Sequence, residues 1–250
     1  MRTTTVINQK GGVGKTTTAH ALATGLTKRG YKVLCVDMDP QGNLSFTMGA
    51  DTTGPSLYEA MREEAEISTA IRSTNQGDIL PGSILLAAAD MEFTATGREW
   101  ILESLLSPIK EHYSHIIIDS PPTLGILTIN ALTASTDVVI PMGADIYSLQ
   151  GLYQLHSTIL KVRQYCNKNL KIAGLLLTRY NSRSILSRDL REGIEEKASE
   201  LNAHLYSTFI REGIMVKEAQ TSQASLFNYA PKSKPAQDYE DFISEYLEQA

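Results

Sequence analysis

Two lysines, Lys10 and Lys15, lie in a glycine-rich stretch near the amino end of the chain, NQKGGVGKTTT. Its glycines, Gly11, Gly12 and Gly14, permit backbone angles that other residues resist, so that N–H groups can point inward at anionic oxygens. Lys15 and Thr16 then open an alanine-rich helix, whose amino end adds positive potential. A strand, a glycine loop and a helix in this order predict a phosphate-binding site. There Lys15 would reach the phosphates and the Thr16 hydroxyl would bind Mg²⁺.

The loop departs from the strict phosphate-loop pattern G-x-x-x-x-G-K-[ST], which requires glycine at position 9, where this chain has Gln9. It reads K-G-G-V-G-K-T-T instead, with Lys10 as an additional lysine. Since one lysine serves the phosphates, Lys10 needs a separate role. The alternative is that the glycines only make a compact turn and Lys10 is a solvated surface charge. The order of strand, glycines, lysine and threonine favours the phosphate site.

Three aspartates follow strand-like runs, where the carboxyl ends of parallel strands would place them beside the loop. Asp37 and Asp39 lie in VDMDPQGN, whose proline and glycine turn the chain, and Asp119 ends HIIID, which has the form of a Walker B strand. An aspartate after an apolar strand often only caps a turn. Three of them after a phosphate loop favour Mg-ATP binding, with Asp37, Asp119 and Thr16 near the metal.

Strands and helices alternate along the chain and must position these residues. Strands are expected at Thr3–Asn8, Lys32–Asp37, His115–Asp119, Asp137–Pro141, Ile172–Thr178 and Leu205–Ile210. Helices are expected at Ala19–Arg29, Arg98–Tyr113, Leu149–Cys166, Arg188–Leu201 and Gln237–Leu247. Several strands are apolar without alternation, which indicates a sheet covered on both faces. We therefore predict a doubly wound, mostly parallel α/β sheet flanked by helices, in one domain spanning residues 1–250. Residues 51–89 indicate only a short helix, loops and a minor strand.

The composition is that of an ordinary globular protein, with 42% hydrophobic and 20% charged residues among 250. No apolar run approaches the ~20 residues that span a bilayer, and the first residues lack the apolar middle of a secretory signal. We therefore expect a cytoplasmic protein. The net charge is −5, but it is unevenly distributed. Residues 161–191 contain eight basic residues and one acid, whereas residues 236–250 contain five acids and no base. A basic window of this kind predicts contact with a polyanion, although a charge run is also typical of a solvated helix face.

The loop K-G-G-V-G-K-T-T, the element D-x-D-P-Q-G-N and the segment IREGIMVKEAQ resemble the ParA/MinD group of deviant Walker A P-loop ATPases, and the ParA-type partition ATPases in particular. The resemblance covers almost the whole chain. It implies a Mg-dependent ATPase in which Lys10 reaches across a homodimer to the nucleotide of the other subunit. It also implies that Asp39 positions or activates the attacking water, so that Lys10, Lys15 and Asp39 are the catalytic residues. The implied nucleotide contacts are Lys10, Gly11, Gly12, Val13, Gly14, Lys15, Thr16 and Thr17, with Thr178 or Asn181 near the adenine.

In that family the ATP-bound dimer binds DNA without sequence preference, and a ParB-like centromere-binding protein stimulates hydrolysis. By resemblance, the chain would position plasmid, chromosome or mobile-element DNA and associate with the nucleoid when ATP-bound. The candidate DNA contacts are Arg183, Arg188, Arg191, Arg211, Lys217, Lys232 and Lys234. Many relatives carry I-P-R-N-x-R before the Glu-Ala pair. This chain has IREGIM there, so two arginines are out of register.

A MinD-like membrane-cycling positioning ATPase is the main alternative, because it uses the same loop. Such a protein would end in a basic amphipathic helix suited to anionic lipid. The segment DYEDFISEYLEQA is acidic, which argues against a membrane partner. Nitrogenase-reductase-like proteins also share the loop, but neither Cys35 nor Cys166 follows a glycine-rich loop suited to holding a cluster. A further alternative is an ATP-gated binding module with negligible hydrolysis of its own.

Overall fold

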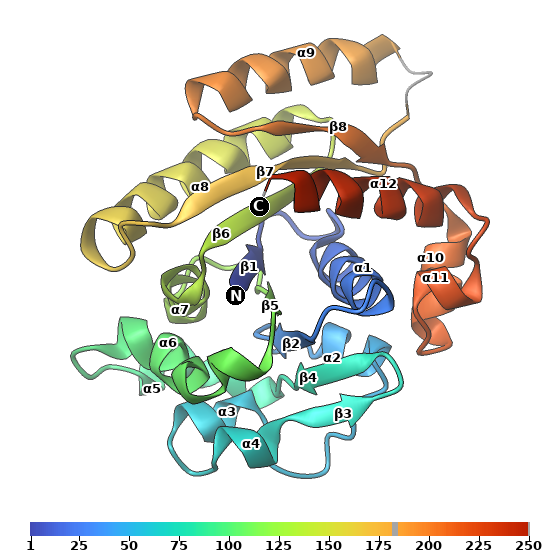
Figure 1. Cartoon of the computed structure of the whole chain (residues 1–250). Helices are drawn as coiled ribbons and strands as arrows, with labels where there is room; N and C mark the ends of the chain where they lie inside the picture. Colours follow the sequence, from blue (N-terminus) through green and yellow to red (C-terminus); the bar gives the residue numbers. More distant parts are fainter. Residues whose placement is uncertain (182–184, 250) are drawn as a thin grey trace.

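The computed structural model describes residues 1–181 and 185–249, and within that range it leaves the side chains of residues 185–188 undescribed. The described residues form one eight-stranded sheet in the order β3-β4-β2-β5-β1-β6-β7-β8 (Figure 1). Its strands are β1 (Arg2–Val6), β2 (Val33–Asp37), β3 (Arg72–Thr74), β4 (Gly77–Leu80), β5 (His115–Asp119), β6 (Asp137–Met142), β7 (Lys171–Thr178) and β8 (Leu205–Ile210). Neighbouring strands are parallel, apart from the antiparallel pair β3 and β4 at one edge.

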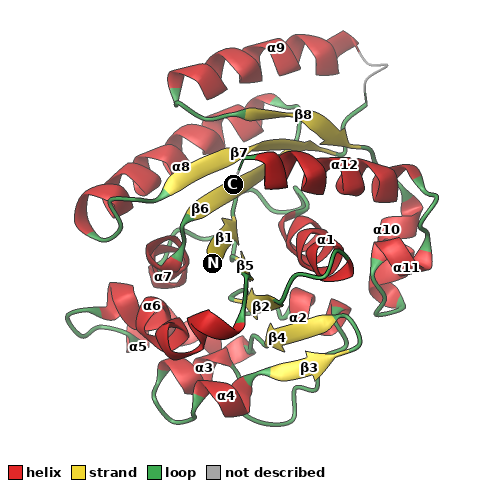
Figure 2. Ribbon diagram, in the orientation of Figure 1, coloured by secondary structure: helices red, strands yellow, loops and turns green. Residues whose placement is uncertain are grey.

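Helices connect the strands and lie on both sides of the sheet (Figure 2). They are α1 (Lys15–Lys28), α2 (Asn43–Thr47), α3 (Leu57–Met61), α4 (Ile67–Ala70), α5 (Ala89–Glu92), α6 (Ile101–Leu106), α7 (Ile126–Ala134), α8 (Ile146–Tyr165), α9 (Ile185–Glu200), α10 (Ile214–Thr221), α11 (Leu226–Tyr229) and α12 (Lys234–Glu248). Short 3-10 turns occupy η1 (Ile84–Ala88), η2 (Arg98–Trp100) and η3 (Ser107–His112). None of the helices described could cross a membrane, since none is both long and apolar enough.

Both faces of the central strands are buried, which explains their unbroken apolar sequence. In β5, Ile117 packs with α1 and α12 on one face, whereas Ile116 and Ile118 pack with α6 and α7 on the other. Farther along the sheet, Val138 and Ile140 of β6 pack against α8. The predicted doubly wound, mostly parallel α/β fold is therefore confirmed, and each of the six predicted strands is present.

The helix α12 is fixed to the first strand of the chain. The Thr4 and Tyr246 hydroxyls are 2.7 Å apart, and an Arg2 N–H donates to the Tyr246 carbonyl at 2.8 Å. The Arg2 guanidinium also lies 3.7 Å from the centre of the Tyr246 ring and 2.7 Å from the Asp137 carboxylate. Residues from β1, β6 and α12 thus form one buried polar cluster.

Candidate functional site

The glycine loop between β1 and α1 is held by its neighbours. Asn8 donates from Nδ2 to the Pro141 carbonyl at 2.9 Å and accepts the Lys10 N–H on Oδ1 at 2.9 Å. Gly12 and Gly14 have φ of +73° and +83°, the left-handed region that favours glycine. A Cβ added at Gly12 would meet nothing within 4 Å, so the loop backbone faces open space there. The loop therefore has the shape of an anion cradle.

Lys15 is buried behind the loop, with 8% of its surface exposed. Its Nζ donates to the Lys10 carbonyl at 3.3 Å. Burial lowers the pKa of Lys15, and the charges of Asp119 and Asp39 partly offset that effect. The ammonium group thus lies between the loop and the strand-end carboxylates.

Neighbouring elements brace the loop and the start of α1. The Thr178 hydroxyl, at the end of β7, donates to the Val13 carbonyl at 2.8 Å. On the other side, Gln220 of α10 donates to the Thr17 hydroxyl at 3.0 Å. Thr178, expected near the adenine, therefore supports the phosphate loop in this structure. Asn181 lies exposed just beyond β7. A contact of either residue with a base stays a prediction.

The three predicted aspartates meet the loop at the carboxyl edge of the sheet. Asp37 and Asp119 are direct neighbours across β2 and β5, and Asp119 is also paired with Val6 at the end of β1. Asp37 and Asp119 are fully buried, and Asp39 is 9% exposed. Parallel strand ends bring together residues that lie more than eighty positions apart in the sequence.

The carboxylate of Asp119 has no hydrogen-bond partner of ordinary geometry among the described residues, although both of its oxygens are buried. Burial raises the pKa of Asp119 well above its usual range, and the charge of Asp37 adds to that effect. The Thr16 hydroxyl and the Lys15 charge act in the opposite direction. Buried polar groups in proteins are normally paired, so an unpaired carboxylate indicates a position that a cation completes.

These residues fit a magnesium ion shared with a phosphate ligand. The described chain has no cluster of three His, Cys, Asp or Glu side chains that could hold a metal alone. Mg²⁺ in nucleotide sites commonly uses one or two protein ligands together with water and phosphate oxygens. Asp119 and Thr16 match that requirement.

Asp37 accepts three hydrogen bonds that the sequence did not predict. Its carboxylate accepts from the Ser45 N–H at 2.8 Å, the Ser45 hydroxyl at 2.7 Å and the Asp39 N–H at 3.2 Å. Burial raises the pKa of Asp37 to about 6 despite the Ser45 hydrogen bonds. Asp37 therefore anchors α2 and the Asp39 loop, and its contact with magnesium stays a prediction.

Sequence reasoning missed Ser45 and Gly82 as parts of this site. The Ser45 hydroxyl accepts the Gly82 N–H at 3.0 Å while it donates to Asp37. A Cβ at Gly82 would lie 2.8 Å from the Asp37 carbonyl oxygen and 3.1 Å from that of Asp39. The only sequence signal was the Pro81-Gly82 turn, which does not tell where the turn packs.

Sequence reasoning also missed Asp90, which contacts the start of α7. Its carboxylate accepts the Ile126 N–H at 2.7 Å and so caps α7. That helix starts directly after the loop that follows Asp119, and a Cβ at Gly125 would collide with the same carboxylate. The segment around α5 thus fixes the far end of the loop between Asp119 and α7.

Lys10 contacts its own chain in this structure. Its Nζ lies 2.7 Å from each carboxylate oxygen of Asp145 and 5.9 Å from the centre of the Tyr147 ring. Asp145 precedes α8 and accepts from the Ser148 N–H and hydroxyl at 3.0 and 2.8 Å. Partial burial alone would raise the pKa of Asp145, but the bonds from Lys10 and Ser148 lower it below its usual value. The cross-subunit role of Lys10 stays a prediction.

The basic candidates for DNA contact fall into two groups. Arg211 binds Asp238 through its backbone N–H and its guanidinium, and Arg191 pairs with Glu195 at 3.1 Å. Three lysines are exposed and have no ion pair within the described chain: Lys217, Lys232 and Lys234. Arg183 and the side chain of Arg188 lie outside the described residues.

The three lysines come from elements that lie near one another. Lys217 is on α10, Lys232 immediately precedes α12, and Lys234 begins α12. A Cβ at Gly213, just before α10, would lie 2.7 Å from Pro235 in α12. Figure 1 shows the beginnings of α10 and α12 side by side. We call Lys217, Lys232 and Lys234 the α10–α12 lysines.

The basic window at residues 161–191 is not one surface. Lys168 lies before β7 and Lys171 begins it, whereas Arg179 follows its end. An eight-residue strand separates the two groups, which at ~3.3 Å per residue is about 25 Å. The clustering in sequence therefore overstated the local charge density.

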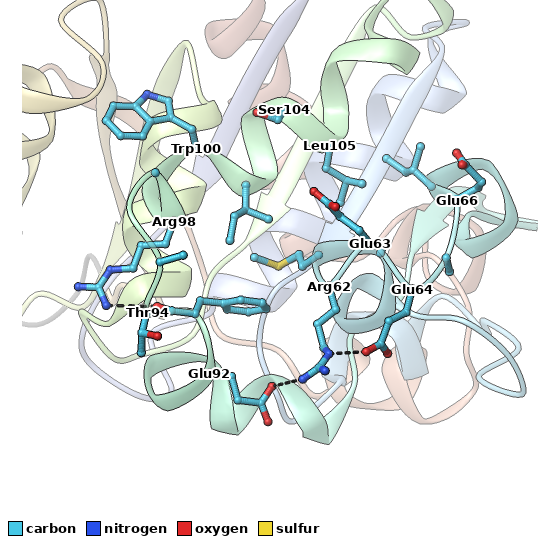
Figure 3. Close-up of a pocket in the computed structure, with 18 of the residues that line it drawn as sticks. Arg62, Glu63, Glu64, Glu66, Glu92, Thr94, Arg98, Trp100, Ser104 and Leu105 are labelled. Carbon is cyan, nitrogen blue, oxygen red and sulfur yellow. Dashed lines mark hydrogen bonds and ion pairs between the residues drawn. The ribbon is translucent and has the colours of Figure 1, made fainter.

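A separate hollow of about 1050 Å³ lies beside α3, α4 and α6 (Figure 3). Figure 3 shows Arg62 on one side of it, paired with Glu64 at 2.7 Å and Glu92 at 3.1 Å. Its lining includes no residue of the glycine loop and none of the three strand-end aspartates. It is therefore distinct from the phosphate site.

Comparison with known proteins agrees with this geometry. A family model described as an AAA domain (AAA_31) matches residues 1–172. The chain is 39% identical to the sporulation initiation inhibitor protein Soj of Bacillus subtilis, over 96% of both chains. It is 34% identical to the chromosome-partitioning ATPase Soj of Treponema pallidum, over 98% of this chain and 97% of that one.

Among solved structures, the chain is 35% identical to a Mycobacterium smegmatis protein named cobyrinic acid a,c-diamide synthase. That protein was crystallised with a bound ATP analogue and magnesium. It superposes with a TM-score of 0.82 over 99% of this chain and 94% of that one. The similarity to both Soj proteins extends beyond the residues that the family model matches, through nearly the full length of the chain. The chain belongs to the ParA/Soj family of chromosome-partitioning ATPases.

Proposed function

We propose that this chain is a Mg-dependent ATPase that hydrolyses ATP to ADP and phosphate in order to partition DNA. The observation that carries the proposal is the fully buried carboxylate of Asp119, which has no hydrogen-bond partner of ordinary geometry among the described residues and lies near Lys15 and the open glycine loop. A neighbour at 35% identity was crystallised with an ATP analogue and magnesium, which supports the same ligands here. The named relatives support DNA partition as the use of the ATPase.

In this proposal the chain's own groups bind and orient the triphosphate. The N–H groups of the glycine loop and the amino end of α1 bind the phosphates, and Lys15 reaches the β- and γ-phosphates. Asp119 and Thr16, with Asp37 nearby, hold magnesium, which when bound neutralises charge on the phosphates. Asp39 lies on the turn after β2, where its carboxylate accepts the Gln41 N–H at 3.0 Å, and it positions the attacking water.

The nucleotide also controls assembly. Lys10 reaches the nucleotide of a second copy, so that ATP stabilises a homodimer and its hydrolysis releases the subunits. The ATP-bound dimer binds DNA without sequence preference through lysines and arginines that neutralise phosphates. A ParB-like centromere-binding protein stimulates hydrolysis and thereby frees the DNA, which is a plasmid, a chromosome or a mobile element.

Sedimentation velocity tests the proposal directly. The protein is run with Mg²⁺ and either ATP or ADP, with and without a DNA duplex of arbitrary sequence, across a salt series. We expect a monomer or weak dimer with ADP, a dimer with ATP, and DNA binding only with ATP that weakens steeply with salt. Equal sedimentation with ATP and ADP would contradict the assembly step. Equal DNA binding with either nucleotide would contradict ATP control.

A further inference from the structure

In the single chain Lys10 already has an anionic partner, whereas its proposed role requires it to bind the nucleotide of a second copy. Its ammonium group lies 2.7 Å from both oxygens of Asp145 on the same chain. That geometry uses two of its three N–H donors. With one N–H donor left, the ammonium group cannot give a phosphate on another subunit the two hydrogen bonds that it gives Asp145. The pair with Asp145 must therefore open before Lys10 can act across a dimer.

Asp145 is held in place independently of Lys10. Its carboxylate caps α8 by accepting from the Ser148 N–H at 3.0 Å and the Ser148 hydroxyl at 2.8 Å. The helix it caps has 20 residues and packs on the sheet through Leu152, Leu155 and Ile159. The acceptor of the ion pair is thus part of the rigid framework, and the flexible lysine is the group that moves.

The neighbouring aromatic ring contributes to the same resting position. Tyr147 is 73% exposed, and its ring centre lies 5.9 Å from the Lys10 ammonium. A lysine at this distance from an aromatic face gains a weak electrostatic attraction. Asp145 and Tyr147 together favour the folded-back conformation of Lys10.

We propose that Asp145 is a positioning residue that retains Lys10 on its own subunit and thereby sets the ATP concentration at which two copies join. The inference rests on the cross-subunit role of Lys10 in the proposed function. Part of the free energy gained when Lys10 binds ATP on the second copy is used to break its ion pair with Asp145. The ion pair therefore opposes dimerisation until ATP offers Lys10 a stronger partner. The two side chains are 38% and 37% exposed, so the opposition is modest.

The size of the effect follows from the strength of exposed ion pairs. Such pairs change an equilibrium by about 1.5- to 5-fold. A symmetric dimer opens the pair once in each subunit, so the two effects multiply to about 2- to 25-fold. Abolishing the pair should strengthen ATP-dependent dimerisation by that factor.

The test compares wild type with Asp145→Asn, because asparagine keeps the size and capping ability of aspartate but removes its charge. Sedimentation velocity is measured over a range of concentrations of a non-hydrolysable ATP analogue with Mg²⁺, so that hydrolysis does not interfere. Because each dimer binds two analogue molecules, we expect half-maximal dimerisation at about 1.5- to 5-fold lower analogue concentration in Asp145→Asn. Glu64→Gln, which removes an equal charge at the distant hollow, should match wild type. A midpoint in Asp145→Asn that is unchanged or higher overturns the proposal.

Further variants separate this inference from the proposed function. Lys10→Ala alone should fail to dimerise, and adding Asp145→Asn to Lys10→Ala should restore nothing. If Lys10→Ala dimerises normally, the cross-subunit role is wrong. If Lys10→Ala blocks the dimer while Asp145→Asn has no effect, only the retaining role of Asp145 is wrong. Should thermal melting show that Asp145→Asn is unfolded, Asp145→Ser supplies a second neutral capping residue for the same measurement.

Discussion

Asp39 and Asp119 place two carboxylates near one ammonium group, that of Lys15, and Asp37 lies beside Asp119 at the end of the neighbouring strand. Burial raises the pKa of Asp37 and Asp119, so ionising both costs free energy in the protein alone. A divalent cation and a phosphate ligand would supply the missing positive charge and the missing hydrogen-bond acceptors together. The charge balance of the site therefore favours the two ligands as a pair over either one separately.

Asp39→Ala should separate hydrolysis from assembly. Since this carboxylate is proposed to position the attacking water, its loss should lower phosphate release by about 10²- to 10⁴-fold, while ATP binding continues. The ATP-bound dimer should then accumulate on DNA and persist. Phosphate release is measured by a coupled assay, and the dimer by sedimentation in parallel. Wild-type turnover in the variant would show that another group positions the water.

Gly82→Ala should disturb the same step through packing. The added methyl group would approach the Asp37 and Asp39 carbonyl oxygens at 2.8 and 3.1 Å, so the loop that carries Asp39 must shift. A displacement of that kind should lower turnover by about 10- to 100-fold, with a smaller change in the affinity for ATP. Gly151→Ala is the matched control, because a Cβ there meets nothing within 4 Å. Equal turnover in the two variants would rule out the packing argument.

The sequence revealed the residue types of the site but not their partners. The loop and three aspartates could be predicted, because strand ends in a parallel sheet share one edge. The pairing of Lys10 with Asp145 joins positions 135 apart, and no local pattern encodes it. Asp37 was expected beside the metal, and only the structure showed its bonds to Ser45.

Helix α1 is tied to three other segments through one buried pair, His20 and Gln76. The Gln76 side chain donates to the Thr47 carbonyl at 2.9 Å and the Gln223 carbonyl at 3.0 Å. Its oxygen is then free to accept from His20 Nε2 at 2.9 Å, which places a proton on Nε2 of His20. The pair links α1 to the β3–β4 turn, to α2 and to the segment after α10.

This pair predicts a measurable loss of stability in acid. Burial lowers the pKa of His20 to about 4. In the unfolded chain His20 binds a proton near pH 6.5, whereas in the folded chain it does so only near pH 4. The free energy of unfolding is therefore highest above pH 6.5 and falls between pH 6.5 and 4. The loss attributable to His20 is at most roughly 3 kcal/mol. Urea unfolding at pH 7, 6 and 5 should show a shallower decline for His20→Gln than for wild type.

His112→Gln provides the control for that measurement, because His112 is exposed. Its decline with pH should follow wild type. Parallel curves for His20→Gln and wild type would mean that His20 does not contribute to the acid sensitivity.

Periodicity predicted some elements well and others poorly, for a physical reason. The six predicted strands are buried on both faces, and their branched apolar runs are a strong signal. Helix α7 (Ile126–Ala134) was missed because eight of its nine residues are buried, which leaves no polar face to reveal a helical period. The short hairpin of β3 and β4 lies in the region that was assigned mainly to loops, because strands of three and four residues give little pattern.

The molecule as a whole is acidic, so the proposed DNA binding must depend on local surfaces. The α10–α12 lysines are exposed and have no acidic partner in the described chain, whereas Arg211 is committed to Asp238. Their location on neighbouring elements favours them over the arginines as phosphate contacts. The uneven charge distribution seen in the sequence survives folding only in part, because β7 separates the two ends of the basic window.

Replacing the α10–α12 lysines by alanine should weaken DNA binding of the ATP-bound dimer equally for all DNA sequences. The dependence of log affinity on log salt should become shallower by about 0.9 for each DNA phosphate that the variant no longer neutralises. Lys168→Ala is the control, because Lys168 is also exposed but lies before β7. Fluorescence anisotropy with a labelled duplex across a salt series measures both quantities. An unchanged salt slope in the triple variant would place the DNA surface elsewhere.

The attachment of α12 to β1 has a consequence for how the chain matures during translation. Tyr239, Phe242 and Tyr246 of α12 complete the apolar cluster around α1, and Tyr246 binds residues of the first strand. A nascent polypeptide that has not yet extruded residues 234–248 from the ribosome leaves that cluster open to water. Folding intermediates of this kind expose apolar surface until late in synthesis, and such surface is what chaperones bind.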